Sequence, residues 1–301
     1  MTKEQRLKNL EVPKGQIDVV IDTDAQNEVD DQFAISYLLR STEKLNTVAL
    51  YAAPYSLPGK ATVAEGMEAS YREILKLLEL AGEEKPAFRG SDRYLPDKCT
   101  PVVSEAVRDL CERVESYSPE KPLYIIAIGA LTNIASALLL SDKVRKNAVV
   151  VWLGGHGHEL GWTDEFNMRQ DLAATRIVMT SGVPFIQVPC ECVANTFSIS
   201  APELKEYLVG KNPLADYLAN NILTAQKNAG NAKWARVLWD VVAVGWLLND
   251  NSRFMFSRVM PTYTPTDDYK YELIDGAPES GYVFWINRTA LMTDLLDKLM
   301  K

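Results

Sequence analysis

The sequence predicts a single-domain α/β protein with an open, mostly parallel sheet and helices on both faces. Short apolar runs rich in β-branched residues recur along the chain, and segments with helical spacing separate them. No repeat, low-complexity tract or Gly/Ser linker interrupts this order over the 301 residues. Since α/β folds often reach about 250 to 300 residues as one unit, we expect one domain over residues 1–301.

Five runs are expected to form the strands of this sheet. They are IDVVI (17–21), TVALYA (47–52), LYIIAI (123–128), AVVVWL (148–153) and PFIQVP (184–189). Each run is continuously apolar instead of alternating, which is typical of strands covered on both faces. The runs therefore predict a sheet between two helical layers.

The segments between the runs predict crossover helices. Phe33 and Tyr37 follow the first run at helical spacing, and Ile134 and Leu138 follow the third. Strand, helix and strand in succession indicate right-handed crossovers and a parallel sheet. Residues 202–249 are expected to be mainly helical. Residues 259–286 are expected to form short strands that cap the sheet before a last helix, TALMTDLLDKLM.

The composition excludes some classes of protein. The formal charge of −8 and the pI near 5.0 argue against nucleic-acid binding, which depends on Lys and Arg neutralising phosphates. No stretch resembles a secretory h-region or a membrane span, so we expect a cytoplasmic protein without a membrane partner. The motif CEC at Cys190 and Cys192 is interpreted as a strand end with both thiols on one face.

Four aspartates are crowded where the first run ends and the next helix begins. These are Asp22, Asp24, Asp30 and Asp31. Ligands bind beyond the carboxyl ends of strands in open parallel sheets. Helix capping explains two such carboxylates but not four. Their chemistry leaves two readings open: an all-oxygen site for calcium or magnesium, or solvated charges at a strand end.

The aspartate cluster and three later segments resemble the nucleoside hydrolases of the inosine-uridine-preferring type. The four aspartates match the family's DxDPGxDD signature after a strand. IAIGALTNIASALL (126–139) is similar to the family's strand-GPLTNIA-helix segment, DEFNMRQDLAATRIV (164–178) to EFNxxxDPEAA, and LWDVVAVGWLL (238–248) to HDPxAVAxLL. The four matches occur in the family's order and span most of the chain.

The resemblance implies a calcium-dependent hydrolase that cleaves the N-glycosidic bond of ribonucleosides. Asp24 would be general base on a calcium-bound water, and the calcium ligands would be Asp24, Asp31, Asp240 and the main-chain carbonyl of Ile128. The ribose hydroxyls would be bound by the remaining family positions: Asp30 at the 2′-hydroxyl, Asn167 at the 3′-hydroxyl and Glu165 at the 5′-hydroxyl. A carboxylate-rich pocket agrees with an oxocarbenium-like transition state.

The chain also departs from the family pattern. AQNEV (25–29) is two residues longer than the family's loop, and Asn27 within it could supply an amide near the substrate. Trp239 replaces the family's histidine before Asp240, and an indole can stack on a base but cannot protonate it.

Other residues are candidates for the nucleobase half of the pocket. His156 or His158, the only two histidines, could donate a proton there, with His156 the chosen candidate. Tyr55 and Trp162 are further aromatic candidates.

Two other functions compete with hydrolysis. A calcium-stabilised ribose or nucleoside receptor without turnover remains open because the usual histidine and asparagine are missing. A magnesium-dependent phosphoryl-transfer enzyme is disfavoured because the chain has no GxxxxGK[ST] loop. The expected partner is a small-molecule nucleoside, or a related N-ribosyl compound. We expect a homo-oligomer, either a dimer or a tetramer.

Overall fold

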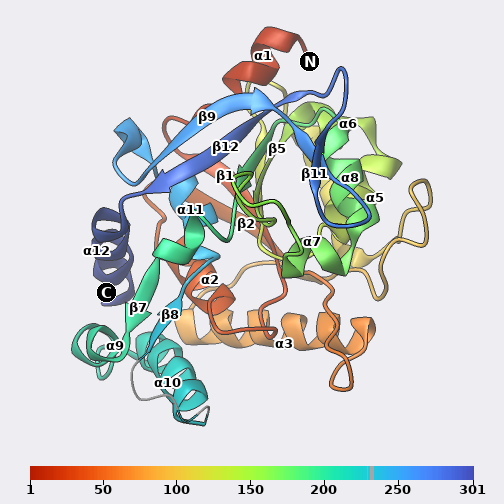
Figure 1. Ribbon diagram of the computed structural model, residues 1–301. Helices are drawn as coiled ribbons and strands as arrows, with labels where there is room; N and C mark the ends of the chain where they lie inside the picture. The colour runs from red at the N-terminus through yellow and green to blue at the C-terminus, as the bar shows by residue number, and fades with distance from the viewer. Residues whose placement is uncertain (229, 231–233) are drawn as a thin grey trace.

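A central sheet of eight strands organises the computed structural model, which describes residues 1–228, 230 and 234–301. Its order is β3-β2-β1-β4-β5-β6-β12-β9. Neighbouring strands are parallel from β3 to β12, and β9 is antiparallel to β12 (Figure 1). The strands are β1 Ile17–Thr23, β2 Leu45–Ala52, β3 Ala87–Arg89, β4 Leu123–Ala127, β5 Ala148–Leu153, β6 Phe185–Val188, β9 Met255–Pro261 and β12 Glu279–Ile286.

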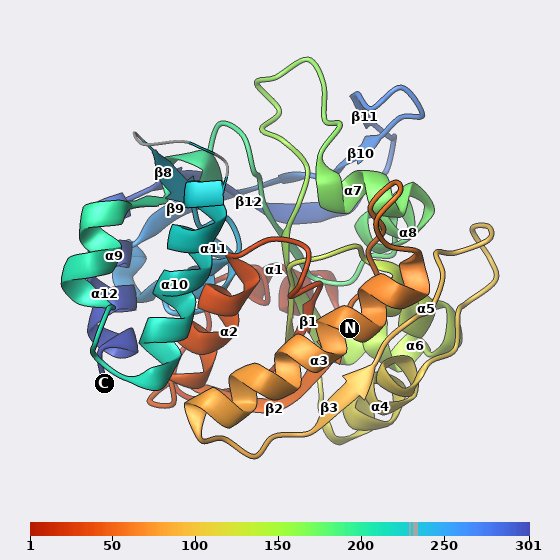
Figure 2. The same ribbon diagram turned by 90° about the horizontal axis from the view of Figure 1, so that it is seen from below.

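Helices cover both faces of this sheet, as Figure 2 shows. One layer contains α2 Asp31–Leu39, α3 Val63–Ala81, α9 Ala201–Tyr207, α10 Pro213–Asn228, α11 Val241–Leu247 and α12 Arg288–Leu299. The other contains α4 Glu105–Arg113, α5 Thr132–Leu140, α6 Asp142–Asn147 and α8 Leu172–Thr180. The short helices α1 Lys3–Lys8 and α7 Phe166–Gln170 lie outside these layers.

Alternate strand residues pack into the two layers, which explains the continuous apolar runs. In β5, Val149 and Val151 contact the α2 side, whereas Val150 and Trp152 contact the α4 side. Successive side chains of a strand point to opposite faces, so most positions of a strand covered on both faces are apolar. The predicted fold class and all five strands are confirmed.

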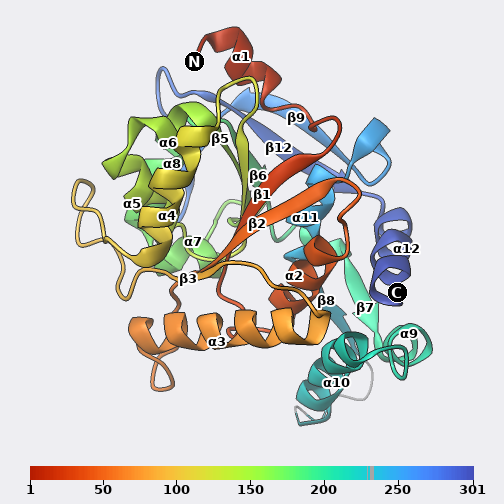
Figure 3. The ribbon, with the colours of Figure 1, turned by 180° about the vertical axis from the view of Figure 1, so that it is seen from behind.

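The prediction was incomplete near the sheet edges. The three-residue strand β3 was not expected, and residues 259–286 do not simply cap the sheet. Instead, β12 pairs in parallel with β6, and β9 forms the last strand (Figure 3). Separate two-stranded sheets are formed by β10 Tyr263–Pro265 with β11 Tyr271–Leu273, and by β7 Ser198–Ser200 with β8 Ala235–Val237.

Short 3₁₀ helices are found at Val114–Ser116, Ala194–Thr196 and Asp250–Ser252. Within the described part of the chain, no helix has the length and apolarity needed to span a bilayer.

Candidate active site

The carboxyl ends of the parallel strands bring the aspartates together. Asp22 lies within β1 and Asp24 follows its last residue, while Asp30 is the N-cap of α2 and Asp31 its first residue. All four side chains are buried. Burial excludes the alternative of solvated strand-end charges.

A distant aspartate completes the cluster. Asp240 is the N-cap of α11, which packs against α2. One carboxylate oxygen each from Asp30, Asp31 and Asp240 lies within 4.8 Å of the others. The tightest trio thus includes Asp30, which the family pattern assigns to ribose, together with two of the expected calcium ligands.

The charges of this cluster are poorly compensated by the protein. Burial, followed by repulsion from Asp31, raises the pKa of Asp24 well above its usual range. Burial and then Asp30 raise the pKa of Asp31 to about 8, and burial and then Glu28 raise that of Asp30 to about 6. Burial and then Asp30 also raise the pKa of Asp240 well above its usual range.

These carboxylates fit a hard divalent cation. Oδ2 of Asp24 is buried and has no hydrogen-bond partner in the described structure. The main-chain oxygen of Ile128 lies nearby, accepting a hydrogen bond from Asn167 Nδ2 at 3.3 Å. An all-oxygen set of this kind suits Ca²⁺ or Mg²⁺, and a cation would relieve the repulsion between the carboxylates.

The longer loop between β1 and α2 is held by specific contacts. The backbone N–H of Asn27 donates to the Asp24 carbonyl at 2.8 Å, and Gln32 Nε2 donates to the Ala25 carbonyl at 2.6 Å. Glu28 forms an ion pair with Arg236 of β8. The two additional residues are therefore accommodated before Asp30, which keeps its place at the start of α2.

Backbone amides hold Glu165 in one orientation. Its Oε1 accepts from the N–H of Asn167 at 2.9 Å, and its Oε2 accepts from the N–H groups of Gly155 at 2.9 Å and Met168 at 3.0 Å. Asn167 Nδ2 donates to Ile128 and to the carbonyl of Leu153 at 3.0 Å. Since an amide has two N–H donors, only Oδ1 of Asn167 remains for a ligand.

The two histidines have different environments. His156 is buried, and its Nδ1 accepts from the Glu191 N–H at 3.4 Å. Burial lowers its pKa, against the opposing effect of Glu165 and Glu191. The side chain of His158 instead lies among three tyrosine rings, with centroids 4.5 to 4.8 Å away: Tyr263, Tyr271 and Tyr282.

Asp22 does not line the cavity of about 240 Å³ at this site, but ten other residues that the sequence analysis assigned to the site do. They are Asp24, Asn27, Asp30, Asp31, Ile128, His156, Glu165, Asn167, Trp239 and Asp240. The other three candidates, Tyr55, His158 and Trp162, do not line this cavity. Trp162 instead meets the His156 ring edge-on, with centroids 4.5 Å apart.

The sequence analysis missed several lining residues. Leu153, Asp164, Phe166, Arg169, Cys190 and Glu191 also border the cavity. The interpretation of the CEC motif was wrong, because the chain turns after β6: Cys190 is buried, whereas Cys192 is exposed with a φ of 74°. The position of the motif directly after a predicted strand was the signal that could have placed Cys190 at the site.

A family model described as inosine-uridine preferring nucleoside hydrolase matches residues 19–284. This range contains all four motifs and every residue that lines the cavity. The chain belongs to this family. The family predicted from the sequence, and with it the prediction of a nucleoside hydrolase, is confirmed.

Two individual proteins are similar in sequence to part of this chain. An uncharacterized protein of Schizosaccharomyces pombe is 29% identical over 202 residues, 58% of this chain and 61% of that protein. A probable uridine nucleosidase 2 of Arabidopsis thaliana is 27% identical over 220 residues, 66% of this chain and 67% of that protein. The alignments thus span about two thirds of these relatives.

Solved structures share the fold over nearly the whole chain. An inosine-guanosine nucleoside hydrolase superimposes with a TM-score of 0.75 at 18% identity, covering 94% of this chain and 99% of that one. A purine-preferring ribonucleoside hydrolase from Gardnerella vaginalis superimposes with a TM-score of 0.73 at 17% identity, covering 94% and 98%. At this identity, the likeness is one of fold.

Proposed function

We propose that this chain is a calcium-dependent hydrolase of the N-glycosidic bond of ribonucleosides, or of a related N-ribosyl compound. The observation that supports this most is the convergence of Asp24, Asp31, Asp240 and the Ile128 carbonyl on one cavity, with an unpartnered oxygen on Asp24. Asp24, Asp31, Asp240 and Ile128 are the proposed calcium ligands. Bound there, calcium would keep the surrounding carboxylates ionised and make water more acidic.

Asp24 acts as the general base in this proposal. Its free Oδ2 accepts a proton from the water that attacks the anomeric carbon of the ribose. As the glycosidic bond breaks, positive charge develops on the ribose, and the carboxylates that line the cavity stabilise this charge. The same carboxylates would repel a substrate that carries a negative charge on its sugar.

The remaining hydrogen-bonding capacity of the site suits ribose hydroxyls. Oε1 of Glu165 accepts one backbone N–H and Oε2 accepts two, so Oε1 is the oxygen with capacity for the 5′-hydroxyl. Oδ1 of Asn167 accepts from the 3′-hydroxyl, because its N–H donors are used. Asp30 is assigned to the 2′-hydroxyl. Asn27 borders the same cavity and is a further candidate for binding the substrate.

The nucleobase is proposed to lie between Trp239 and His156. Trp239 lines the cavity and presents an indole for stacking. Since Nδ1 of His156 accepts a hydrogen bond, the neutral ring has its proton on Nε2 and offers an N–H donor to the base. Because burial lowers the pKa of His156, the ring is uncharged at neutral pH and offers an N–H hydrogen bond to the base instead of the proton of an imidazolium.

A hydrolysis assay with a panel of nucleosides tests this proposal. Purified protein should release free ribose from inosine or uridine and should contain one equivalent of calcium by elemental analysis. Asp24→Asn should lose roughly 10²-fold or more in kcat while remaining folded, since an amide cannot accept the proton. Asp18→Asn, on the strand β1 that precedes Asp24 but outside the cavity, is the matched control.

Three results would contradict the proposal. Nucleoside binding in a calorimeter without release of ribose would instead support the receptor alternative. Wild-type kcat in Asp24→Asn would rule out Asp24 as the base, and active protein without a divalent metal would rule out the calcium site.

A further inference from the structure

Glu191 lines the cavity but belongs neither to the aspartate cluster nor to the residues proposed to bind ribose. Two other lining carboxylates also lie outside those groups, and both are neutralised by the protein. Glu28 forms an ion pair with Arg236, and Asp164 forms one with Arg169 at 2.8 Å. Over the described residues, the carboxylate of Glu191 accepts one hydrogen bond and forms no ion pair. Its negative charge is therefore available to a ligand.

The Glu191 carboxylate is held at one oxygen only. Its Oε2 accepts a hydrogen bond from Asn195 Nδ2 at 2.7 Å, whereas Oε1 has no partner in the described part of the chain. The backbone N–H of Asn195 donates to the Cys190 carbonyl at 3.0 Å, which fixes Asn195 against the start of the same turn. Oε1 of Glu191 thus retains its capacity to accept a hydrogen bond from a ligand in the cavity.

Glu191 lies beside His156, the histidine that borders the proposed nucleobase site. The backbone N–H of Glu191 donates to His156 Nδ1 at 3.4 Å, and its carbonyl accepts from the N–H of Gly157 at 2.9 Å. Burial lowers the pKa of His156, and the charges of Glu165 and Glu191 oppose this effect, which agrees with a carboxylate close to the ring. A hydrogen-bond donor and an acceptor therefore border the cavity from adjacent positions.

Purine bases differ at the atoms that such a pair would contact. N7 of adenine is an acceptor and its neighbour is the 6-amino donor, whereas a 6-oxo purine has acceptors at both positions. A hydrogen bond from His156 Nε2 to N7 draws electrons from the base and assists its departure. In that pose the 6-substituent lies toward Glu191, where a 6-amino group donates to the carboxylate and a 6-oxo group leaves two acceptors facing each other.

We propose that Glu191 selects 6-aminopurine ribosides, such as adenosine, over 6-oxopurine ribosides, such as inosine. This inference rests on the proposed function, to which it adds the substrate class. Oε1 of Glu191 accepts from the 6-amino group while His156 donates to N7. The matching family is described as inosine-uridine preferring, so a preference for adenosine distinguishes this chain within it.

The selectivity should have the size of one hydrogen bond to a charged group. Such a bond corresponds to roughly 10- to 10²-fold in kcat/KM. Sites that fully bury the group that reads a substrate N–H discriminate by about 10⁴-fold or more. Glu191 is only partly buried, so we expect the smaller range.

Steady-state kinetics of Glu191→Gln test this role. Adenosine and inosine are compared by kcat/KM, with purine riboside, which has hydrogen at position 6, as the reference substrate. Because Asn195 donates to one oxygen of Glu191, the amide of the variant should turn its oxygen to Asn195 and its N–H₂ to the ligand. The amide then donates to a 6-oxo group, so the adenosine-to-inosine ratio should fall roughly 10²-fold relative to wild type. The ratio cancels intrinsic differences between the leaving groups.

Glu159→Gln is the matched control, because Glu159 lies in the loop after His158 but does not line the cavity. This variant should keep the wild-type ratio. A wild type that prefers inosine, or an unchanged ratio in Glu191→Gln, would overturn the role of Glu191 while leaving hydrolysis intact. Failure to release ribose from all three ribosides would contradict the proposed function instead. In that case the adenosine-to-inosine ratio of Kd, measured by calorimetry in wild type and Glu191→Gln, decides whether Glu191 reads the base.

Discussion

At the scale of single residues, His156 and His158 show how two nearby side chains of one type take different roles. The His156 ring lines the cavity with its tautomer set by the Glu191 N–H. His158 is surrounded by tyrosines, and neither ring nitrogen has a hydrogen-bond partner in the described structure. Burial lowers the pKa of both imidazoles. Of the two histidines, only His156 borders the cavity in which the nucleobase is proposed to bind.

The side chains of Trp239 and His156 predict how the leaving group affects the rate of hydrolysis. Because Trp239 cannot donate a proton, p-nitrophenyl riboside or a cationic N-ribosyl pyridinium should be cleaved roughly 10²-fold or more faster than inosine. His156→Ala should slow inosine hydrolysis about tenfold, the worth of one hydrogen bond, and leave p-nitrophenyl riboside unchanged. His158→Ala is the control and should not discriminate between the two substrates. Equal rates for inosine and the activated riboside would show that a leaving-group acid is present after all.

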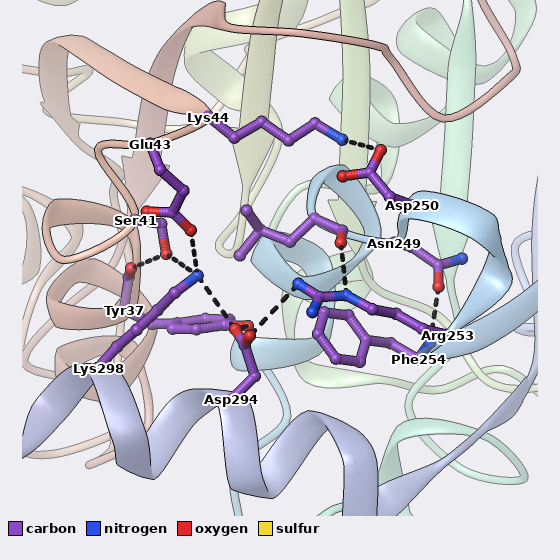
Figure 4. Close-up of polar contacts among 11 residues, drawn as sticks. Tyr37, Ser41, Glu43, Lys44, Asn249, Asp250, Arg253, Phe254, Asp294 and Lys298 are labelled. Atoms are coloured by element: carbon purple, nitrogen blue, oxygen red, sulfur yellow. Dashed lines mark hydrogen bonds and ion pairs between the residues drawn. The ribbon is translucent and has the colours of Figure 1, made fainter.

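At the scale of elements, a polar network fastens the C-terminal helix α12 to the end of α2 (Figure 4). The buried Lys298 contacts Glu43 at 2.7 Å, Asp294 at 3.0 Å and the Ser41 hydroxyl at 3.1 Å. Asp294 also accepts a hydrogen bond from the Tyr37 hydroxyl at 2.5 Å. Since α2 begins with Asp31, this network supports the helix that positions the cluster.

Removing the central cation should loosen this attachment. We expect Lys298→Ala to lower the free energy of unfolding by about 2 kcal/mol, below the 3 to 5 kcal/mol typical of a fully buried pair, because Glu43 is more than half exposed. Lys3→Ala, which removes an exposed lysine paired with Glu279, should cost less than about 1 kcal/mol. Urea denaturation of both variants measures the difference, and equal losses would contradict the structural role of Lys298.

At the scale of the whole molecule, stability should depend on calcium. Buried carboxylates from β1, α2 and α11 repel one another without a cation, so a ligand that binds only the folded state stabilises it. At a concentration 100 times its Kd, calcium should add about 2.7 kcal/mol and raise the melting temperature by roughly 5 °C relative to chelated protein. Differential scanning calorimetry of wild type and Asp240→Asn checks this. The same shift in both would exclude Asp240 as a ligand.

The sequence predicted the fold class and five of the eight strands of the main sheet, and it named ten residues that line one cavity. Strands buried on both faces are mostly apolar, so β1, β2, β4, β5 and β6 can be recognised in the sequence as apolar runs. Carboxylates that directly follow an apolar run can be recognised in the sequence in the same way, because few roles other than ligand binding require them there. The roles expected for Asp24, Asp31, Asp240 and Asn167 came from the resemblance to the nucleoside hydrolases, and all four residues line one cavity.

Only the tertiary structure decided features that depend on contacts between distant segments. Which histidine borders the cavity follows from the packing of residues 155–158 against the turn at Cys190 and Glu191. That β12 joins β6 and leaves β9 as the free edge follows from pairing across about 95 residues, for which the local pattern of 259–286 has no signal. Local sequence encodes which face of a strand is buried, whereas the choice of neighbours depends on the energy of the whole packed sheet.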